Sequence, residues 1–194
     1  MKNIVTGIIL TLLAAACSTD WNFENTGLAR ERFDGTMYEY LKSNPYDWDS
    51  VRLVIERAGM VDMFDGGEEF TFFGPTNHSI RRWMNNNSIA AIRDIPVAEC
   101  ASIVNDHVLD GTLARDDIPE GEFTGGSWKG GKAYTFRSGK SIMIYRLLGS
   151  YMNVPKAGAA EIHLNQTTSV ASSNIRPTNG IVHSLVYSYI LGTL

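Results

Sequence analysis

The chain has 194 residues, and domains usually contain about 100 to 200, so the length favours a single domain with a sizeable core. Hydrophobic residues make up 44% of the chain, and 17 basic residues against 21 acidic ones give a net charge of −4. No basic run or patch is visible, which argues against nucleic acid as a partner.

The first residues have the pattern of a targeting segment. Lys2 gives a positive start, and an apolar run covers Ile4 to Leu13. This run is shorter than the roughly 20 residues that a membrane-spanning helix needs. The stretch LAAAC then places small residues directly before Cys17, which resembles the signal of a bacterial lipoprotein.

This resemblance implies that residues 1–16 are a signal peptide and that Cys17 is lipidated, with palmitate among its acyl chains. Residues 17–32 are then expected to be a tether and residues 33–194 the domain. Ala14 stands where such signals usually have leucine. The alternative is an ordinary secretory signal that ends near a cysteine.

Hydrophobic periodicity predicts helices in the first half of the chain. TMYEYLKSNP places apolar residues on one helical face and has Pro45 as its stop. DWDSVRLVIERAGM repeats apolar residues at helical spacing, with Asp49 or Ser50 as its cap and Gly59 at its end. Further helices are expected at roughly 79–85 and 97–108.

Cys100 lies in the last of these helical runs. Cys17 and Cys100 are the only two cysteines, so a chain that carries lipid on Cys17 has no internal disulfide. An apolar surrounding favours a buried, inert thiol at Cys100. A catalytic thiol would need a base and an electropositive setting.

Strand patterns dominate the second half. FTFF reads as a buried strand between the helices, and five later β-type runs are separated by glycine, asparagine, serine and proline. The runs are KAYTFRS, SIMIYRL, SYMNV, EIHLNQT and IVHSLVYSYIL. Helices first and strands later indicate an α+β fold.

Three segments together resemble a fasciclin-like domain. They are FTFFGPTNHSI, NDHVLDGTL and SSNIRPTNGIVHSLVYSYIL, in the order and spacing of one complete copy. The resemblance implies N-terminal helices packed against a β-sandwich or wedge of short strands. The residues that match the family's motifs, expected to be mostly structural, are Thr71, Phe73, Pro75, Thr76, Asn77, His107, Gly111, Asn179, Gly180 and His183.

Several positions depart from the family pattern. Gly74 and Ile80 replace the usual alanine and phenylalanine. Asp106 stands where animal adhesion members often carry a tyrosine proposed for integrin contact. Val186 stands where an acidic residue usually follows the last histidine, so the hydrogen bonds of His183 are expected to differ.

The corner GPTN admits a structural and a chemical interpretation. Pro75 suits a strand end, and Thr76 and Asn77 are both good N-cap residues for the helix that follows. We therefore expect this corner to cap a helix. A site that touches a ligand is the alternative.

No motif for a metal, a cofactor or a catalytic nucleophile is apparent. His107 and His183 are expected to be buried core histidines, with a metal pair as the alternative. The acidic residues Asp106, Asp110, Asp116 and Asp117 are more typical of a solvated loop than of a glycosidase pair. Trp128 and Tyr134 are possible partner contacts on a glycine-rich loop, or else loop anchors.

The expected function is a non-enzymatic binding or adhesion domain. The lipid would anchor it to the outer membrane of a Gram-negative bacterium, at the cell surface, with protein or glycan partners. Two alternatives remain at this point: a hydrolase directed at polysaccharide, and an accessory subunit of an outer-membrane uptake complex.

Overall fold

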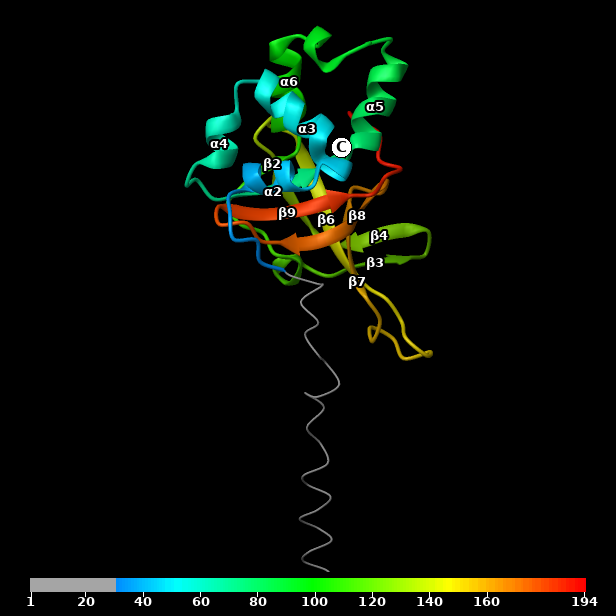
Figure 1. Cartoon of the computed structure of the whole chain (residues 1–194). Coiled ribbons are helices and arrows are strands. Elements are labelled where there is room, and N and C mark those ends of the chain that lie inside the picture. Colours follow the sequence, from blue (N-terminus) through cyan, green and yellow to red (C-terminus); the bar gives the residue numbers. More distant parts are fainter. Residues whose placement is uncertain (1–30) are drawn as a thin grey trace, which may run out of the picture. The chain divides into compact units, whose positions relative to one another are not determined.

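The computed structural model describes residues 31–194 (Figure 1). The expected signal peptide, Cys17 and residues 18–30 of the expected tether lie outside the described residues. Glu31–Leu194 form one compact unit with its own core, which is the property of a domain able to fold by itself. None of the helices in this unit is long and apolar enough to cross a bilayer.

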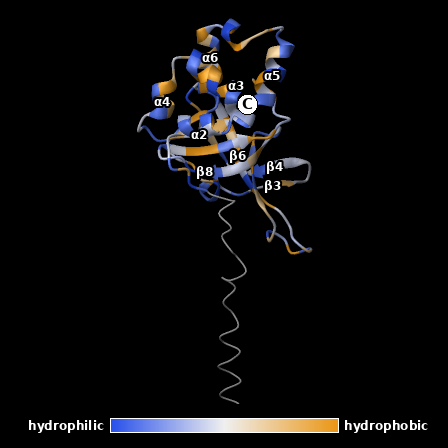
Figure 2. Ribbon diagram, viewed as in Figure 1, coloured by the Kyte–Doolittle hydropathy of each residue, from blue (hydrophilic) through white to orange (hydrophobic). Residues whose placement is uncertain are grey.

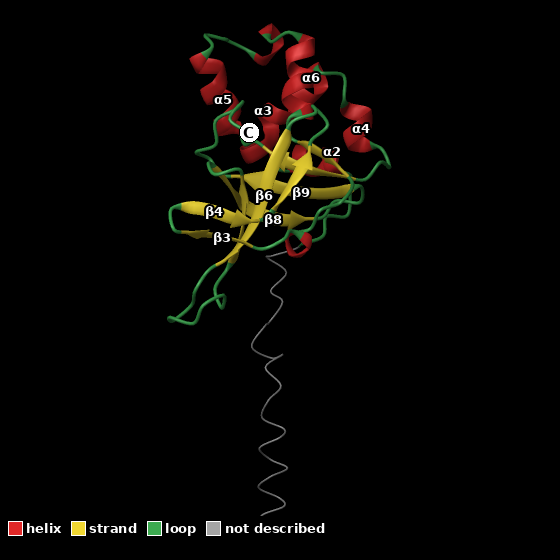
Figure 3. Cartoon of the chain, turned by 180° about the vertical axis from the view of Figure 1, so that it is seen from behind, coloured by secondary structure: helices red, strands yellow, loops and turns green. Residues whose placement is uncertain are grey.

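Helices gather at one end of the domain and strands at the other (Figures 1 and 3). The α-helices are α2 (Met37–Ser43), α3 (Pro45–Arg57), α4 (Val61–Asp65), α5 (Asn77–Asn86) and α6 (Val97–Asn105). The described residues also contain two short 3₁₀ helices, η3 (Ile92–Asp94) and η4 (Arg115–Asp117).

Seven strands form the main sheet in the order β2-β1-β9-β8-β7-β6-β5, and β3 pairs with β4 in a separate hairpin. The strands are β1 (Phe70–Gly74), β2 (Val108–Asp110), β3 (Gly121–Thr124), β4 (Ser127–Gly130), β5 (Lys132–Thr135), β6 (Ser141–Leu148), β7 (Ala160–Leu164), β8 (Thr168–Ile175) and β9 (Gly180–Leu185). The expected α+β fold is confirmed.

The pairing of β1 with β9 is parallel, although the other pairs of the main sheet are antiparallel. It runs over five residue pairs, from Phe70 with Gly180 to Gly74 with Ser184. This pairing lays the strand of the first family segment beside the strand of the last one.

The start of α3 differs from the sequence expectation. Pro45 was expected to stop a helix, yet it is the first residue of α3, and the preceding helix ends at Ser43. Proline suits this place because the first N–H of a helix has no partner within the helix. The expected end is confirmed: Gly59 has a φ of +70°, and the Met60 N–H donates to the Ile55 carbonyl (3.1 Å).

Three other segments also differ from expectation. The helix expected over 97–108 ends at Asn105, and Val108 begins β2. SYMNV is the tip of the β6–β7 hairpin, with positive φ at Met152 and Asn153, and is not a regular strand. Beyond Leu185 the closing segment continues as turns. Local patterns predicted these ends poorly because pairing across the sheet decides them.

The core lies between the helices and the sheet. Figure 2 shows strongly hydrophobic ribbon in α6 and in the strand that Figure 1 labels β9. Phe64 of α4 packs edge-on against Phe70 and Phe72 of β1, with both ring centroids 5.1 Å away. The geometry is favourable for aromatic pairs and locks α4 onto β1.

Trp48 explains the glycine at position 74. A Cβ built on Gly74 would lie 2.4 Å from the Trp48 ring, which is closer than any real contact allows. The tryptophan is buried, with 2% of its surface exposed. Its side chain occupies the space that an alanine at position 74 would need.

We predict that Gly180→Ala destabilises the domain by about 3 kcal/mol or more. Gly180 has a φ of +145°, and an added Cβ would lie 2.0 Å from the Phe70 carbonyl oxygen. Gly111→Ala is the matched control, because Gly111 also has a positive φ (+76°) but has nothing within 4 Å of the added atom. Its cost should be about 1 kcal/mol. Urea unfolding measures both, and equal losses would contradict the close approach at Gly180.

Candidate functional site

The opening corner, between β1 and α5, is held by the side chain of Asn77. Its Oδ1 accepts from the Ser50 N–H (2.6 Å), and its Nδ2 donates to the carbonyls of Tyr46 (2.7 Å) and Pro45 (2.9 Å). Tyr46 and Ser50 are four residues apart, so Asn77 bridges two groups that a helix would join directly. The buried amide therefore attaches α5 to the first turns of α3.

Asn179 has the same role at the other end of the chain. Its Oδ1 accepts from the Met37 N–H (2.7 Å), and its Nδ2 donates to the carbonyls of Phe64 (2.8 Å) and Gly66 (2.9 Å). It joins the start of β9 to α2 and to the end of α4. The side-chain amides of both motif asparagines thus form hydrogen bonds with main-chain groups of helices that are distant in the sequence.

The expected capping of α5 is wrong in its detail. Thr76 occupies the N-cap position, but its side chain makes no capping hydrogen bond, and Asn77 lies inside the helix. Sequence reasoning favours local capping because it sees only neighbours in the chain. The tertiary contact to α3 uses the amide of Asn77 instead.

Thr71 provides a further internal connection. Its hydroxyl donates to the Gly111 carbonyl (2.8 Å) and accepts from the Leu113 N–H (2.8 Å). The side chain is fully buried within β1. It fixes the loop that follows β2, and both hydrogen bonds are internal.

His107 is buried with both ring nitrogens occupied. Its Nδ1–H donates to the Ile103 carbonyl (2.7 Å), so Nε2 accepts from the Tyr189 hydroxyl (2.9 Å). Burial is the main reason that the pKa of His107 is lowered to about 4. Burial also raises the pKa of Tyr189, so this pair stays neutral at neutral pH.

His183 is likewise buried and fully paired. Its Nε2–H donates to the Leu113 carbonyl (2.9 Å), and its Nδ1 accepts from the Asn174 N–H (3.3 Å). Burial lowers its pKa to about 4. Because both partners are main-chain groups, Val186 in place of an acid leaves neither nitrogen unpaired. The expectation of two buried core histidines is confirmed.

The expected thiol is also confirmed as buried. Cys100 in α6 has no exposed surface, and burial raises the pKa of its thiol. Within residues 31–194, no three His, Cys, Asp or Glu side chains lie close enough together to hold a metal ion.

Three of the four acidic residues that the sequence singled out form ion pairs with different basic residues; Asp106 directly follows α6, Asp110 ends β2 and Asp116 lies in η4. The pairs are Asp106 with Lys140 (2.9 Å), Asp110 with Arg137 (2.5 Å) and Asp116 with Arg115 (3.1 Å). A glycosidase needs two carboxyl groups facing each other across the substrate. These three acids instead each face a basic group.

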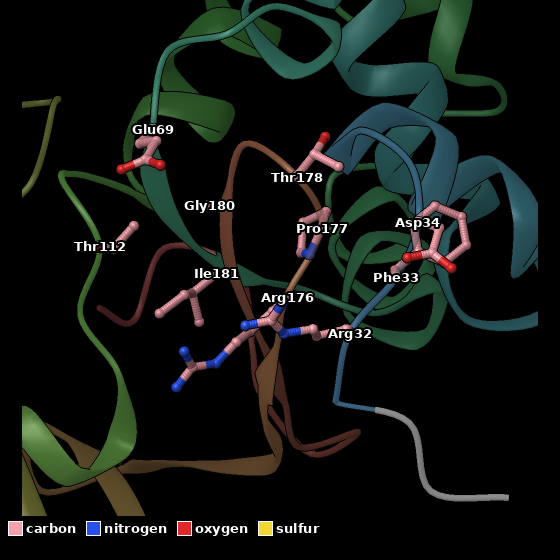
Figure 4. Close-up of a pocket in the computed structure, with 10 residues that line it drawn as sticks. All are labelled: Arg32, Phe33, Asp34, Glu69, Thr112, Arg176, Pro177, Thr178, Gly180 and Ile181. Carbon is pink, nitrogen blue, oxygen red and sulfur yellow. The ribbon is translucent and has the colours of Figure 1, made fainter. Parts of the chain in front are cut away.

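A cavity of about 400 Å³ lies where the described chain begins (Figure 4). Arg32 and Arg176 are neighbours there, joined by a backbone bridge, and Asp34 and Glu69 bring the opposite charge. Arg176 also pairs with Glu31 (2.6 Å). The lining residues include neither histidine nor cysteine.

Trp128 and Tyr134 are placed differently from the expected loop. Trp128 lies on β4 and Tyr134 on β5, and both are half-buried. The Trp128 ring packs against Tyr145 and His163, with centroid distances of 5.2 and 5.4 Å. It therefore anchors the β3–β4 hairpin to the main sheet, which is the alternative that the sequence left open.

An exposed aromatic group that the sequence did not reveal lies beside the opening corner. It consists of Tyr46, His78 and Tyr187, and we call it the corner aromatic cluster. The His78 and Tyr187 rings are 5.0 Å apart, and the Tyr187 hydroxyl donates to Asp47 (2.6 Å). This hydrogen bond is the main cause of the raised pKa of Tyr187, and the nearby Tyr46 adds to it.

Two of these side chains are well exposed. Tyr46 has 83% of its surface accessible and Tyr187 has 49%. Tyrosines of this kind present a large, rigid contact area at low entropic cost. The three residues are far apart in the chain, so no local pattern could have joined them.

Comparison with known proteins agrees with this architecture. The family model described as Fasciclin domain matches residues 47–186. Among solved structures, the chain is similar to a FAS1 domain pair from the insect cell adhesion molecule Fasciclin I, with a TM-score of 0.55 and 19% sequence identity. The match covers 78% of this chain and 49% of that one, so the chain spans about half the length of that structure. No curated protein matches the sequence.

We predict that Asn77→Ala destabilises the domain by about 2 to 4 kcal/mol, because one N–H and two carbonyls lose their partner. Asn86→Ala is the control, since Asn86 is exposed at the end of the same helix. Its effect should stay within about 0.5 kcal/mol. Thermal and urea unfolding measure both. Binding by the folded Asn77 variant should be unchanged, and lost binding at unchanged stability would make Asn77 a ligand contact.

The two buried histidines predict a loss of stability in acid. Their folded pKa of about 4 lies below the usual 6.5, so the unfolded chain binds more protons between these values. Their contribution is complete above pH 6.5 and is lost as the pH falls towards 4, at about 1.4 kcal/mol per pH unit for each histidine. Urea unfolding from pH 7 to 5 measures the slope. His107→Gln and His183→Gln should each remove about half of it, and unchanged slopes would refute this origin.

Proposed function

The chain belongs to the fasciclin domain family, and from this membership we propose that it is a lipid-anchored binding and adhesion protein of the bacterial cell envelope. Fasciclin domains are typically cell-adhesion domains and are generally not enzymes. The proposed partners are proteins or glycans at the cell surface. The proposed anchor is Cys17, in the outer membrane of a Gram-negative cell.

The corner aromatic cluster is the observation that carries the binding role. Exposed aromatic rings stack on sugar rings and also form the energetic centres of protein interfaces. Tyr187 is held in place by Asp47, and the His78 ring packs beside it at a tilt of 46°, so the cluster is ordered before a partner binds. An ordered contact surface loses less entropy on binding.

The buried histidines also favour a binding role over a catalytic one. The motif histidines, His107 and His183, have every ring nitrogen engaged in an internal hydrogen bond. A general base needs a free nitrogen within reach of a substrate proton. Neither histidine offers one, and no contact of the described residues favours the hydrolase alternative.

The binding role is tested by a glycan and protein-partner screen with residues 31–194. For each partner that binds, the double variant Tyr46→Ser and Tyr187→Ser should weaken binding about tenfold or more. Truncating a hot-spot aromatic residue costs about 1 to 2 kcal/mol or more of binding free energy. Phe123→Ser is the matched control, since Phe123 is 60% exposed but lies on β3. If both variants lost the same affinity, the partner would not contact the corner aromatic cluster specifically. A screen without binding would refute the proposal.

The anchor is tested separately in the intact chain. Cys17→Ala should abolish incorporation of labelled palmitate and release the protein from the membrane fraction, because removing the acyl chains removes about 0.8 kcal/mol per buried CH₂. Cys100→Ala is the matched control and should keep the label, as it replaces the only other cysteine. Membrane retention without label would favour an ordinary signal. Purification of the detergent-extracted protein with a membrane complex would instead indicate an accessory subunit.

A further inference from the structure

The loop between β6 and β7 has a composition that is unusual for an exposed segment. It reads GSYMNVPKAGA over residues 149–159, and Lys156 is its only charged residue. Tyr151, Met152 and Val154 have 63%, 80% and 56% of their surface exposed. The surface of a soluble protein rarely carries several exposed apolar side chains together unless they contact another protein or a membrane.

The backbone of this loop is ordered as a narrow hairpin. The N–H groups of Tyr151 and Val154 donate to each other's carbonyls, at 3.1 and 2.8 Å. Further down, the Gly149 N–H donates to the Ala159 carbonyl (3.0 Å). The tip is therefore pre-formed, and we call residues 149–159 the apolar hairpin.

Its turn has a conformation that side chains rarely adopt. Met152 and Asn153 have φ values of +48° and +65°, as in a type I′ turn. Asparagine is common at such positions, whereas methionine is not. The long apolar side chain at the outermost position has no role in the fold that would compensate for this strain.

The apolar hairpin projects from the domain at a particular end. Figures 1 and 3 show it reaching past the strands, at the end opposite the helices. The described chain also begins at this end, where Arg32 forms an isolated backbone bridge with Arg176, just after β8. A domain held by the residues before Glu31 would turn the apolar hairpin towards its point of attachment.

We propose that the apolar hairpin inserts into the phospholipid bilayer that carries the protein. Tyrosine is enriched at the membrane interface, and methionine and valine suit the acyl region below it. Lys156 is the only charged residue of the apolar hairpin, and its ammonium pairs with the Glu120 carboxylate (2.7 Å), so residues 149–159 bring no unpaired charge to the bilayer. The ion pair between Lys156 and Glu120 holds the hairpin against the domain.

The shape of the tip favours a bilayer over a protein partner. A stable protein interface buries about 800 Å² on each side, whereas three side chains on a narrow turn present only part of that area. A bilayer needs no complementary pocket and accepts such a wedge to a depth of about 5 to 10 Å. Thirteen residues lie between Cys17 and Glu31, and the fourteen residue steps from one to the other span at most about 50 Å, so an anchored domain stays near the surface.

The orientation of the domain towards the bilayer rests on the proposed lipid anchor at Cys17. The affinity of the apolar hairpin for lipid does not depend on that anchor. The test therefore uses residues 31–194 with an N-terminal histidine tag, captured on vesicles that contain a nickel-chelating lipid. A polarity-sensitive fluorophore is placed on Met152→Cys in a Cys100→Ala background. The control carries it on Asn86→Cys, at the exposed end of α5 on the helical side.

We expect blue-shifted emission at position 152 and at least about twofold quenching by brominated acyl chains, with neither effect at position 86. Replacing Tyr151 and Val154 with serine should abolish both effects at position 152. Without the tag, the variant with serine at positions 151, 152 and 154 should bind phosphatidylcholine–phosphatidylglycerol vesicles about tenfold more weakly than the unmodified domain. Its thermal unfolding should be unchanged, because the tip lies outside the core.

Several outcomes would overturn the insertion. One is capture of a folded domain with no quenching at position 152. Others are equal quenching at both positions, or a serine variant that contacts vesicles as before but no longer binds a protein partner. Dimerisation through the tip without vesicle contact would count equally against it. In this test the histidine tag holds the domain at the vesicle in place of the lipid. A negative palmitate-labelling result at Cys17 and a negative quenching result at position 152 can therefore be told apart.

Discussion

The parallel pairing of β1 with β9 is the constraint on which the rest of the domain depends. It joins strands about 110 residues apart in the chain, so the closing segment must be in place before the sheet is complete. The close approach at Gly180 makes the pairing possible, since any side chain there would strike the Phe70 carbonyl. β1 then presents Phe70 and Phe72 to α4, and the helical end assembles on this pair.

Two buried asparagines extend this constraint to the helices. Asn77, the first residue of α5, holds α3, and Asn179, directly before β9, holds α2 and α4. Each satisfies main-chain groups that a buried, irregular junction would otherwise leave unpaired, at a cost of roughly 1 to 3 kcal/mol per group. The segments that identify the family are thus largely the parts that close the fold.

This use of polar residues shapes what remains for function. The histidines that first suggest chemistry have their nitrogens engaged inside the domain, and the suspected acids are paired with basic groups. Two groups of exposed side chains remain at the surface: an ordered group of aromatic rings beside the corner, and an apolar hairpin at the opposite end. A rigid scaffold that displays such side chains agrees with the proposed binding role.

Sequence and structure contributed different parts of this picture. Periodicity and turn residues determined the helix over DWDSVRLVIERAGM, its glycine end, the α+β order and the burial of Cys100, because these depend on neighbours along the chain. The family segments determined the fold as a whole. Only the tertiary structure decided that Asn77 holds α3, that Trp128 anchors a hairpin, and that Tyr46, His78 and Tyr187 meet at one surface. These contacts join residues distant in sequence, so they are set by the closure of the sheet and leave no trace in local pattern.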